Sequence, residues 1–503
     1  MTFRRGATTQ AIRTSTAVFA ALLGLVLALV VAVPRAGAEP DDCAAGPSWT
    51  VGTETELNDA IDCYNTALLP DRYTITFSSD IATSSAWPIP TGEGVSSAFR
   101  WISQDGDGYS LTIDGGGFSV WGGGGPDTTL GIERTNLSPV TITNMFVTAG
   151  GVAGVHAVES VVVISDSIVS QNANGILVDA SLVTIVQSVV VENGGPNVDG
   201  HGVINVGTTE IRSSVIDSND GVGVLNQAGD TIVAESSVIA NAVGGVVNLG
   251  GDPVTTISDT TIAENGFEPT SVFGGVHAAQ GTMSMLRVTI TGNGNGVDAV
   301  LSATNPGSIG ADFVTVNDNV GTVAVMGSVS LRSSIADSCI SGVVDLGYNA
   351  GGCFGTAVVD LEPLADNGCL VSTPQGCPAT FRPSTTSAAL GRGDCTDEAM
   401  QRDQTGALRT PLGPGCEAGA VDRDDYTPAA RGEVNCDGVV NIIDALIIAQ
   451  YSVGNRFDQG FCPVNPVDGV NPAAGDMNGD ARVNIIDALI VAQCDAGIAN
   501  PFC

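Results

Sequence analysis

The sequence contains no lysine. Its 18 basic residues are all arginine, and they stand against 54 acidic residues, so the formal net charge of the 503-residue chain is −36. A nucleic-acid partner requires clustered basic groups that neutralise phosphates. We therefore expect no nucleic-acid binding.

Long apolar runs are almost absent as well. The one such run spans residues 17–33, follows two arginines and precedes an Ala-Gly-Ala tripeptide. This pattern predicts a signal peptide over residues 1–38 that is cleaved before Glu39; an uncleaved anchor is the alternative. We expect a secreted or cell-surface protein with no membrane span in the mature chain.

Cysteine is missing from the long middle of the chain, since none of the 12 cysteines falls between Cys63 and Cys339. In an exported protein such residues form disulfides. Local pairs are expected at Cys43–Cys63, Cys339–Cys353, Cys369–Cys377 and Cys395–Cys416. Staples of the C-terminal region, in an order that the sequence leaves open, are expected from Cys436, Cys462, Cys494 and Cys503.

The centre of the chain repeats with a period of about 23 residues. A β-branched residue is followed three positions later by asparagine at Val169/Asn172, Val190/Asn193, Ile216/Asn219, Ile262/Asn265, Ile290/Asn293 and Val316/Asn319. Ile239 fits the same series, although Asn241 then comes one residue early. After the asparagines, short strands are expected at Gly175–Leu177, Gly202–Ile204, Gly245–Val247, Gly275–His277 and Gly296–Asp298.

Short strands, glycine at the bends and almost no helical periodicity predict an all-β fold. Each repeat is interpreted as one coil of a right-handed parallel β-helix, with coils about 4.8 Å apart and inward-facing Val and Ile. The recurring asparagine is expected to stack at one turn and bond to the coils on either side. Residues 50–424 resemble the right-handed β-helix repeat proteins of bacterial surfaces, in which a tail follows the last coil.

A solenoid needs capped ends. The capping-box pattern at Thr53–Glu56 predicts a short amphipathic helix that plugs the N-terminal end. The expected divisions are a signal peptide at 1–38, an N-terminal cap at 39–72, the β-helix at 73–345, its C-terminal end at 346–424, a linker at 425–431 and a further domain at 432–503.

That last domain contains two nearly identical stretches, residues 433–444 and 476–487, each leading into an apolar helical pattern. Each stretch has oxygen-bearing side chains at positions 1, 3, 5, 9 and 12, the spacing with which a 12-residue loop wraps calcium, and position 7 adds a carbonyl. The expected ligands of two calcium ions are Glu433, Asn435, Asp437, Val439, Asn441, Asp444, Asp476, Asn478, Asp480, Arg482, Asn484 and Asp487.

These loops resemble the type I dockerin family, whose pattern Asp-x-Asn-x-Asp-Gly-x-Val-Asn-x-x-Asp occurs twice. The resemblance covers about residues 432–503 and implies a small α-helical, calcium-binding domain that docks secreted proteins onto a cohesin domain. Two positions depart from it: Glu433 replaces Asp, and Ala481 replaces a turn glycine. Since glycine suits the sharp turn best, we expect the second site to be the more strained.

In the dockerin family the residues just before position 12 help to set the choice of cohesin and are often Ser-Thr. Here they are Ile442, Ile443, Ile485 and Ile486. The resemblance therefore implies an apolar partner-binding surface, or a dockerin from a non-cellulosomal system. A purely structural role of the loops is the alternative.

No catalytic signature is complete in the coils. Polygalacturonase-type hydrolases use paired Asp residues, a Gly-His-Gly and a basic Arg-Ile-Lys, of which only the Gly-His-Gly around His201 is present. A turn histidine is the favoured interpretation. Pectate-lyase-type enzymes need a basic residue beside calcium-binding carboxylates. The coils from residue 140 offer only Arg212, Arg287 and Arg332, and Arg287 is expected to form an exposed ion pair with Asp259.

His277 and Asp298 form a further candidate pair. Both follow Val in a Gly-Val-x strand, so we expect their side chains to point outward from adjacent coils. A carboxylate beside an imidazole can serve acid–base chemistry; an ordinary surface pair is the alternative. His156 occupies the same repeat position, and an apolar stripe for docking is expected between the two histidines at Leu177, Ile204 and Val247. A register shifted by one residue would instead place these three side chains in the core.

Aromatic residues make up only 5% of the chain. One cluster precedes residue 150: Trp87, Trp101, Tyr109, Phe118 and Trp121. If a polysaccharide binds, these N-terminal coils are the expected place, unless the rings merely bury the cap. Two functions thus remain open. One is polysaccharide binding or degradation by a dockerin-bearing protein, as hydrolase or lyase, and the other is a non-catalytic structural or adhesive surface protein.

Overall fold

The structure is a computed structural model. It describes residues 43, 46–83, 87–88, 96–104, 106–125, 127–135, 137–195, 200–267, 273–294, 301–304, 306–319, 325–339, 342–355, 359–369, 371–384, 387–395, 402–407, 409, 416–422, 434, 440–452, 477 and 484–496.

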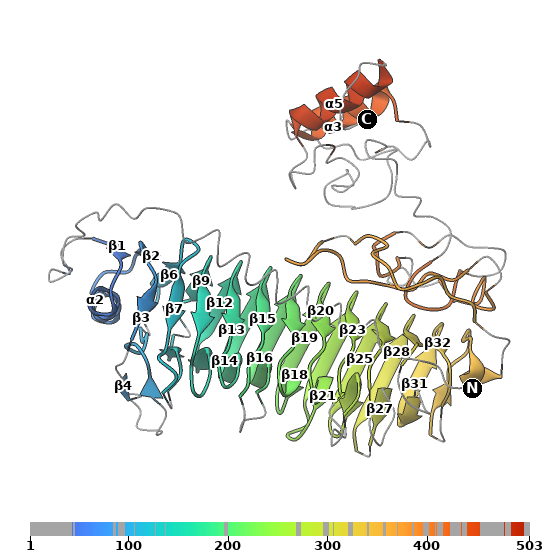
Figure 1. Ribbon diagram of the computed structural model, residues 1–503, viewed down its shortest axis with the longest axis horizontal. Helices are drawn as coiled ribbons and strands as arrows, with labels where there is room; N and C mark the ends of the chain where they lie inside the picture. Colours follow the sequence, from blue (N-terminus) through green and yellow to red (C-terminus); the bar gives the residue numbers. More distant parts are fainter. Residues whose placement is uncertain are drawn as a thin grey trace, which may run out of the picture. The chain divides into compact units, whose positions relative to one another are not determined.

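Short parallel strands stack into a coil with three faces, which confirms the predicted parallel β-helix (Figure 1). Face 1 consists of β8 (Leu130–Glu133), β11 (Val155–Val158), β14 (Ile176–Val186), β16 (Val203–Arg212), β18 (Val222–Asn226), β21 (Gly244–Asn248), β24 (Val276–Ala278), β27 (Leu301–Ala303) and β30 (Val325–Gly327).

Face 2 is the longest of the three. It consists of β1 (Ser48–Val51), β2 (Arg72–Phe77), β6 (Ser110–Asp114), β9 (Val140–Thr143), β12 (Val161–Ser165), the second halves of β14 and β16, β19 (Asp230–Ala234), β22 (Val254–Ser258), β25 (Thr282–Leu286), β28 (Ser308–Asp312), β31 (Val329–Arg332) and β33 (Val344–Asp345). Because β14 and β16 run through both faces, faces 1 and 2 form one hydrogen-bonded sheet.

Face 3 is a separate parallel sheet. It consists of β3 (Ile81–Ala82), β7 (Ser119–Trp121), β10 (Phe146–Thr148), β13 (Ile168–Ser170), β15 (Val189–Val191), β17 (Val215–Asp217), β20 (Ser237–Ile239), β23 (Thr261–Ala263), β26 (Thr289–Thr291), β29 (Thr315–Asn317) and β32 (Ile335–Ala336). A small antiparallel pair, β4 (Trp87–Pro88) and β5 (Ser96–Ser97), lies outside these faces.

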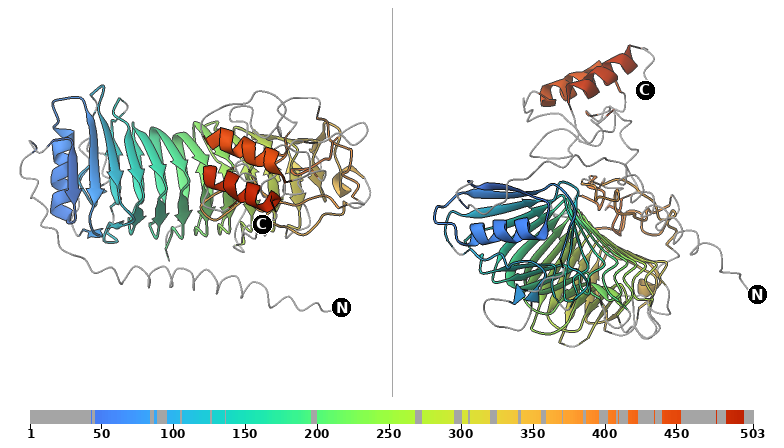
Figure 2. Two further views of the ribbon diagram at one scale, coloured as in Figure 1. Left: turned by 90° about the horizontal axis from the view of Figure 1, so that it is seen from above. Right: turned by 60° about the vertical axis from the view of Figure 1, so that its left-hand side comes forward.

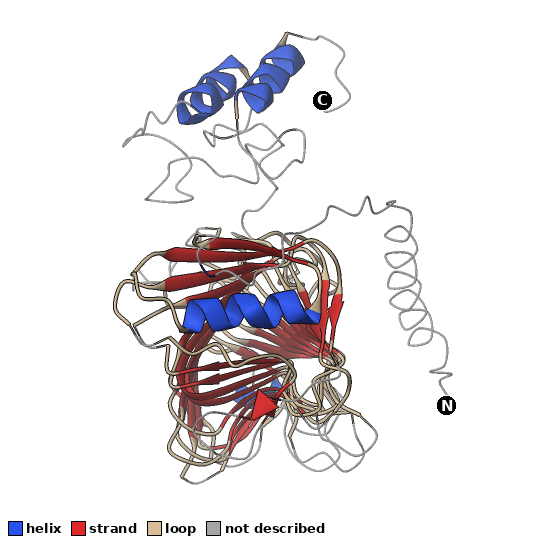
Figure 3. Cartoon of the chain, turned by 90° about the vertical axis from the view of Figure 1, so that its left-hand side faces the viewer, coloured by secondary structure: helices blue, strands red, loops and turns tan. Residues whose placement is uncertain are grey.

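The interior is filled by alternate residues of each strand. In β9, for example, Val140 and Ile142 are buried while Thr141 and Thr143 are partly exposed. This period of two is what β geometry imposes on a strand with one face against a core. Viewed along the coil, the strands surround a closed apolar interior (Figure 3).

The predicted asparagine stack is present at the turn between faces 3 and 1. From Asn193 onward, the Oδ1 atom of each member accepts hydrogen bonds from the backbone N–H and the side-chain amide of the preceding member, at 2.8–3.2 Å. The stack consists of Asn172, Asn193, Asn219, Asn241, Asn265, Asn293 and Asn319.

The placement of Ile239 in this series was wrong by one residue. Val238 is the residue in register with Ile216 and Ile262, so Asn241 follows its β-branched partner by three positions as elsewhere. Ile239 is adjacent and also β-branched and was taken in its place, although the three-residue spacing points to Val238. The strand expected at Gly296–Asp298 lies outside the described residues, and the described strand that pairs with β24 on this side is β27.

A second ladder, which the sequence did not reveal, lies at the turn between faces 2 and 3. Each hydroxyl accepts a hydrogen bond from a backbone N–H of the preceding coil, at 3.1–3.3 Å. Its members are Ser167, Ser188, Ser214, Ser236 and Thr260. The residue before each has a positive φ, as in Asp166 (48°) and Asp259 (51°), so both ladders help to satisfy buried backbone groups at sharp corners.

The N-terminal end is closed by α2 (Glu54–Asn65), as predicted (Figure 3). The Thr53 side chain accepts from the Glu56 N–H, and the Glu56 carboxylate accepts from the Gly52 N–H at 2.7 Å. Leu57 and Ile61 are fully buried against the first coils. One strand was missed: β1 precedes the helix and pairs with β2, so the coil begins within the segment assigned to the cap.

Residues after β33 form a tail that folds back along face 3, whereas the sequence indicated only that they are not coil-like. A short 3-10 helix, η3 (Gly352–Phe354), starts it. Thr261 donates to the Ala379 carbonyl at 2.7 Å, and the Ala420 N–H donates to the Thr315 hydroxyl at 2.9 Å. The described tail thereby covers the outer face of the later coils (Figure 1).

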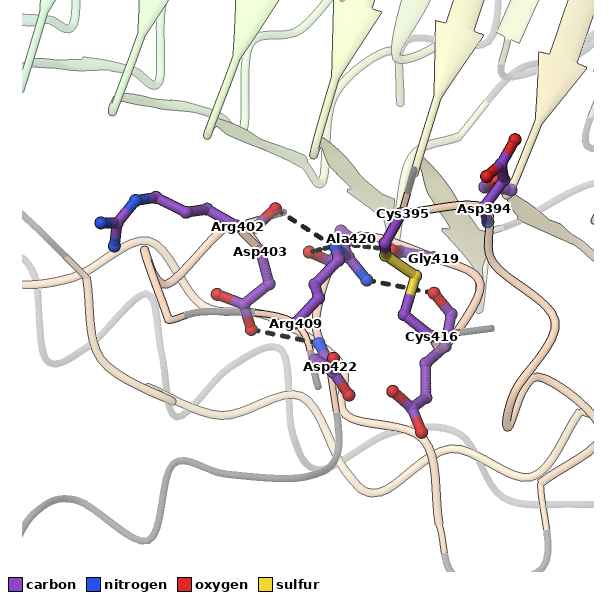
Figure 4. The surroundings of a disulfide bond; sticks show 11 residues. Asp394, Cys395, Arg402, Asp403, Arg409, Cys416, Gly419, Ala420 and Asp422 are labelled. Atoms are coloured by element: carbon purple, nitrogen blue, oxygen red, sulfur yellow. Dashed lines mark hydrogen bonds between the residues drawn. A yellow bond between two sulfur atoms is a disulfide. The ribbon is translucent and has the colours of Figure 1, made fainter. Parts of the chain in front are cut away.

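The tail is organised around a buried arginine, Arg409 (Figure 4). Its guanidinium donates to the carbonyls of Arg402, Glu417, Gly419 and Ala420 at 2.8–3.2 Å, and lies 4.0 Å from the centre of the Phe313 ring. Burial lowers the pKa of Arg409 to about 10, a value that keeps the side chain charged at neutral pH.

All four predicted local disulfides are present: Cys43–Cys63, Cys339–Cys353, Cys369–Cys377 and Cys395–Cys416. The last of them links two cysteines that flank Arg409 in the sequence (Figure 4). Cys494 is also disulfide-bonded, while Cys436, Cys462 and Cys503 lie outside the described residues. In the described part of the chain, no helix has both the length and the hydropathy to cross a membrane.

Candidate functional site

His201, in the Gly-His-Gly turn, connects neighbouring coils. Its Nδ1 accepts a hydrogen bond from the Val222 N–H at 2.9 Å, and its own N–H donates to Asn174 at 3.1 Å. A side chain at Gly221 would collide with the imidazole, since an added Cβ would lie 2.7 Å from Nδ1. These bonds give His201 a structural role at a turn.

The residue beside His277 on the next strand is Ser302. The His277 Nδ1 lies 2.7 Å from the Ser302 hydroxyl. His277 is only 5% exposed, because Phe273 packs against its ring at 5.0 Å between centroids. Asp298 lies outside the described residues. The coil between β24 and β27 is longer than assumed, which shifted the register.

The apolar row between the histidines is correctly placed. His156, Leu177 and Ile204 are register neighbours along face 1, and the row continues through Leu225 to Val247 and His277. Leu225 and Val247 are buried, with Phe273 packed against their cluster, whereas Leu177 and Ile204 stay partly exposed. The row is therefore half covered by the protein's own side chains.

The three coil arginines are all engaged. Arg287 forms a two-pronged ion pair with Asp259, at 2.6 and 2.8 Å, and the two side chains are only 15% and 18% exposed. The pair was predicted, but it is more buried than expected. Arg332 pairs with Asp312 at 2.8 Å, and Arg212 pairs with Glu210 on its own strand.

Two residues of the N-terminal aromatic cluster are buried. Trp101 and Tyr109 are 3% and 9% exposed, and the Trp101 ring lies edge-on to His156. Trp121 differs, since half of its side chain is exposed. Phe118 is intermediate, and the Trp87 side chain lies outside the described residues.

The C-terminal region contains two matching helices, α3 (Ile442–Ser452) and α5 (Ile485–Asp495), which pack side by side (Figure 2). Ile448 and Val491 are fully buried between them. The Asp495 carboxylate accepts a hydrogen bond from the Ile442 N–H at 3.1 Å, so the end of α5 lies beside the start of α3. The helices are therefore antiparallel.

The helices begin in the same way. In α5, Asn484 caps the helix by accepting from the Ile486 N–H, and Asp487 accepts from the Asn484 N–H in return. Asn441 and Asp444 make the corresponding bonds at the start of α3. A capping box of this kind stabilises the first turn of a helix.

Both position-12 aspartates also tie their loops back to the helix. Asp444 accepts from the Val434 N–H at 2.8 Å, and Asp487 accepts from the Met477 N–H at 2.9 Å. Neither aspartate is exposed to solvent. A carboxylate needs hydrogen-bond partners when it is buried, and each of these two receives backbone N–H groups from its own loop.

The first residues of each helix carry an exposed apolar face. Each of Ile442, Ile443, Ile485 and Ile486 is between 53% and 59% exposed, and Leu446 and Leu489 continue the face at 55% and 57%. Together they line a groove of about 560 Å³. We call these six residues the apolar helix face.

Comparison with known proteins decides what this region is. Residues 431–494 match the dockerin type I domain. Together with the coils, this makes the chain a β-helix with a C-terminal dockerin. No curated protein matches the sequence. Among solved structures, a pectate lyase, Pel9A, aligns over 72% of this chain and 90% of its own, with 13% identity and a TM-score of 0.45, a similarity too distant to bear on function.

Dockerin type I domains bind calcium, and the described loop residues fit that ion. Asn441, Asp444, Asn484 and Asp487 bring only oxygen donors to the loop ends, which is the donor set that calcium prefers. The other predicted ligands, Glu433, Asn435, Asp437, Val439, Asp476, Asn478, Asp480 and Arg482, lie outside the described residues. Among the residues that are described, no three His, Cys, Asp or Glu side chains group closely enough to hold a metal.

Sequence reasoning named four residues of the apolar helix face and missed Leu446 and Leu489. A signal for both was present, because each lies four residues after Ile442 or Ile485 and so on the same side of its helix. It also missed Asp495, whose contact with the other helix depends on how the two repeats pack.

Proposed function

We propose that this protein is secreted, that its calcium-loaded dockerin attaches it to a cohesin domain, and that its β-helix binds or degrades a polysaccharide. The single observation that carries the attachment is the apolar helix face, where six large aliphatic side chains remain more than half exposed. Exposed apolar clusters of this kind mark interaction surfaces. Four disulfides in the described chain support export to an oxidising compartment.

In this proposal calcium acts on the partner surface indirectly. Position 12 of each loop is also the third residue of its helix, so the ion that orders a loop also fixes the start of the helix that presents Ile442 or Ile485. We propose two ions, one per loop, with the ligand sets named from the sequence. The aliphatic residues select a cohesin whose contact surface is itself apolar.

Titration calorimetry of the full-length protein against a panel of cohesin domains tests the attachment. We expect binding by at least one cohesin with calcium and none with excess EDTA. Changing both Ile443 and Ile486 to Ser should weaken that binding by about tenfold or more per site. The matched control is Val254→Ser, which alters a 45% exposed aliphatic residue on the coil. Failure of every cohesin in the presence of calcium refutes the proposal.

A second candidate function is a non-catalytic surface protein with the coil as a rigid spacer. The observation that favours it is that His201, His277 and Arg287 are all held in bonds within the fold. A screen of pectin- and xylan-like polymers for newly formed reducing or unsaturated ends distinguishes the two. Formation of product indicates an enzyme. Cohesin binding, with neither product formed nor any polymer bound, indicates a non-catalytic surface protein.

A further inference from the structure

Face 3 is divided into a covered part and an open part. The described tail bonds to this side of the coil from Gln187 onward, where the side-chain amide donates to the Ser372 carbonyl at 3.0 Å. Accordingly, Val215 on β17 is fully buried although it lies on the outer side of the sheet. On the earlier strands β3, β7, β10 and β13, the outer residues remain partly or fully exposed.

Trp121 lies in this open part. Its register neighbours are Ala82 on one side and Thr148 on the other, so the indole projects above two smaller side chains. Trp49 and Trp101 are 6% and 3% exposed, whereas Trp121 is 50% exposed. Leaving an indole in water forgoes about 2 kcal/mol of possible burial, so its position needs an explanation other than folding.

A second ring lies close to Trp121. Phe146 lies on the next strand, β10, two residues before Thr148, the register partner of Trp121. It is therefore a diagonal neighbour of Trp121 on the same side of the sheet, at about 7–8 Å. Ile168 continues the row of Phe146 on the strand after that. The hydroxyls of Thr148 and Ser170 continue the row of Trp121. The open part therefore offers two rings and a line of hydroxyl groups on one flat sheet.

The charges around this surface are negative. Asp80 immediately precedes β3 and accepts bonds from the backbone and hydroxyl of Ser119, and the exposed Asp166 lies just before β13. The chain has no lysine and a net charge of −36. A polymer of uronic acids would meet electrostatic repulsion here, while an uncharged sugar chain would not.

We propose that the open part of face 3 binds a neutral polysaccharide, with one sugar ring stacked on Trp121, the chain passing Phe146, and its hydroxyls bonded to Thr148 and Ser170. The flat C–H face of a sugar packs well on an indole ring, and the hydroxyl row supplies donors and acceptors for its edge. The inference rests on the polysaccharide part of the proposed function and specifies its surface and its ligand class.

The test is affinity electrophoresis of the full-length protein in gels that contain neutral xylan, neutral β-glucan or polygalacturonate. We expect a neutral polymer to retard the protein and polygalacturonate not to. Trp121→Ala should raise the dissociation constant for the neutral polymer about tenfold. Phe267→Ala is the matched control, since Phe267 is a 52% exposed ring away from the open part. Trp121→Phe should retain part of the binding because it keeps an aromatic ring.

Trp emission gives an independent readout. A neutral oligosaccharide should shift the emission of the wild-type protein, and the shift should be lost in Trp121→Phe. Binding that Trp121→Ala leaves unchanged, or binding of polygalacturonate alone, overturns the inference while leaving the polysaccharide function in place. If no polymer binds and none is cut, the polysaccharide function itself fails. Self-association abolished by Trp121→Ala, without sugar binding, would show that a second copy covers this surface and would also overturn the inference.

Discussion

The coil and the dockerin are both built from repeats, yet they treat carboxylates in opposite ways. In the dockerin each repeat brings acidic oxygens inward, and Asp444 and Asp487 are fully buried at the ends of their loops. In the coil the stacked groups are neutral amides and hydroxyls, and burial raises the pKa of Asp217 on face 3, which lies near Glu192 and Glu264. A repeat closed by amides is complete in itself, whereas we expect a repeat closed by carboxylates to require a cation.

Removal of calcium should break this comparison most visibly. With excess EDTA we expect the dockerin to unfold and cohesin binding to disappear, while the melting transition of the coil stays in place. At a calcium concentration a thousandfold above the dissociation constant, each bound ion contributes about 4 kcal/mol. Calorimetry of the full-length protein with calcium and with EDTA measures both transitions.

Asp487→Asn should reproduce the effect at one loop, with Asp230→Asn on the exposed coil surface as its control. An unchanged melting profile in EDTA would contradict the dockerin half of the comparison. Loss of the coil transition in EDTA would contradict the other half, because it would show that the coil also depends on a cation.

The tail over face 3 also buries acidic side chains, but it supplies its own cation, Arg409. Replacing Arg409 by Met leaves the carbonyls of Glu417, Gly419 and Ala420 without their donor and removes the positive charge beside Asp403. We expect about 4 kcal/mol of lost stability in the tail. Limited proteolysis should then cut the tail while the coils stay resistant. Equal resistance of variant and wild type would show that Arg409 does not hold the tail.

The asparagine stack is the corresponding test within the coil. Asn241 accepts from the backbone and side chain of Asn219 and donates to Ile216, Ile239 and Asn265. Asn241→Leu should therefore cost about 3 kcal/mol or more, since it leaves several buried groups without partners. Chemical denaturation measures the loss. Asn174→Ala, which changes a partly exposed asparagine beside the stack, should cost much less.

The regular features of the fold were the ones that the sequence could predict. Asparagine carries a donor and an acceptor, so its recurrence indicated a stack, and alternating Val and Ile indicated an inward row. The Ser and Thr ladder gave no comparable signal, because these residues are frequent throughout the coil. Insertions between coils explain the error at His277, where a repeated Gly-Val pair was taken for the next strand.

Contacts between the tail and the coil could not be predicted. Nothing in the local pattern indicates that Ala379 lies against Thr261, or that Gln404 bonds to Thr289 at 2.7 Å. The dockerin differs in this respect. The resemblance to its family named four of the six residues of the apolar helix face, while the calcium ligands named from the loop spacing stay a prediction. In a metal-binding loop the ligands lie at fixed spacings in the sequence. Which strands of face 3 stay exposed depends instead on how far the tail extends over them.

The smallest expected effect concerns the coil's own acids. Burial, followed by the nearby charges of Glu192 and Glu264, raises the pKa of Asp217 above its ordinary value of 3.8. The folded chain therefore binds this proton more tightly than the unfolded chain, so the group destabilises the coil at neutral pH and ceases to do so as the pH falls through the raised pKa. Asp217→Asn keeps an acceptor for the Ser218 hydroxyl. It should raise coil stability at pH 7 by up to about 1 kcal/mol. Melting curves of the variant and the wild type should converge near pH 3. A variant that is less stable than the wild type at pH 7 would show that the ionised acid supports the coil.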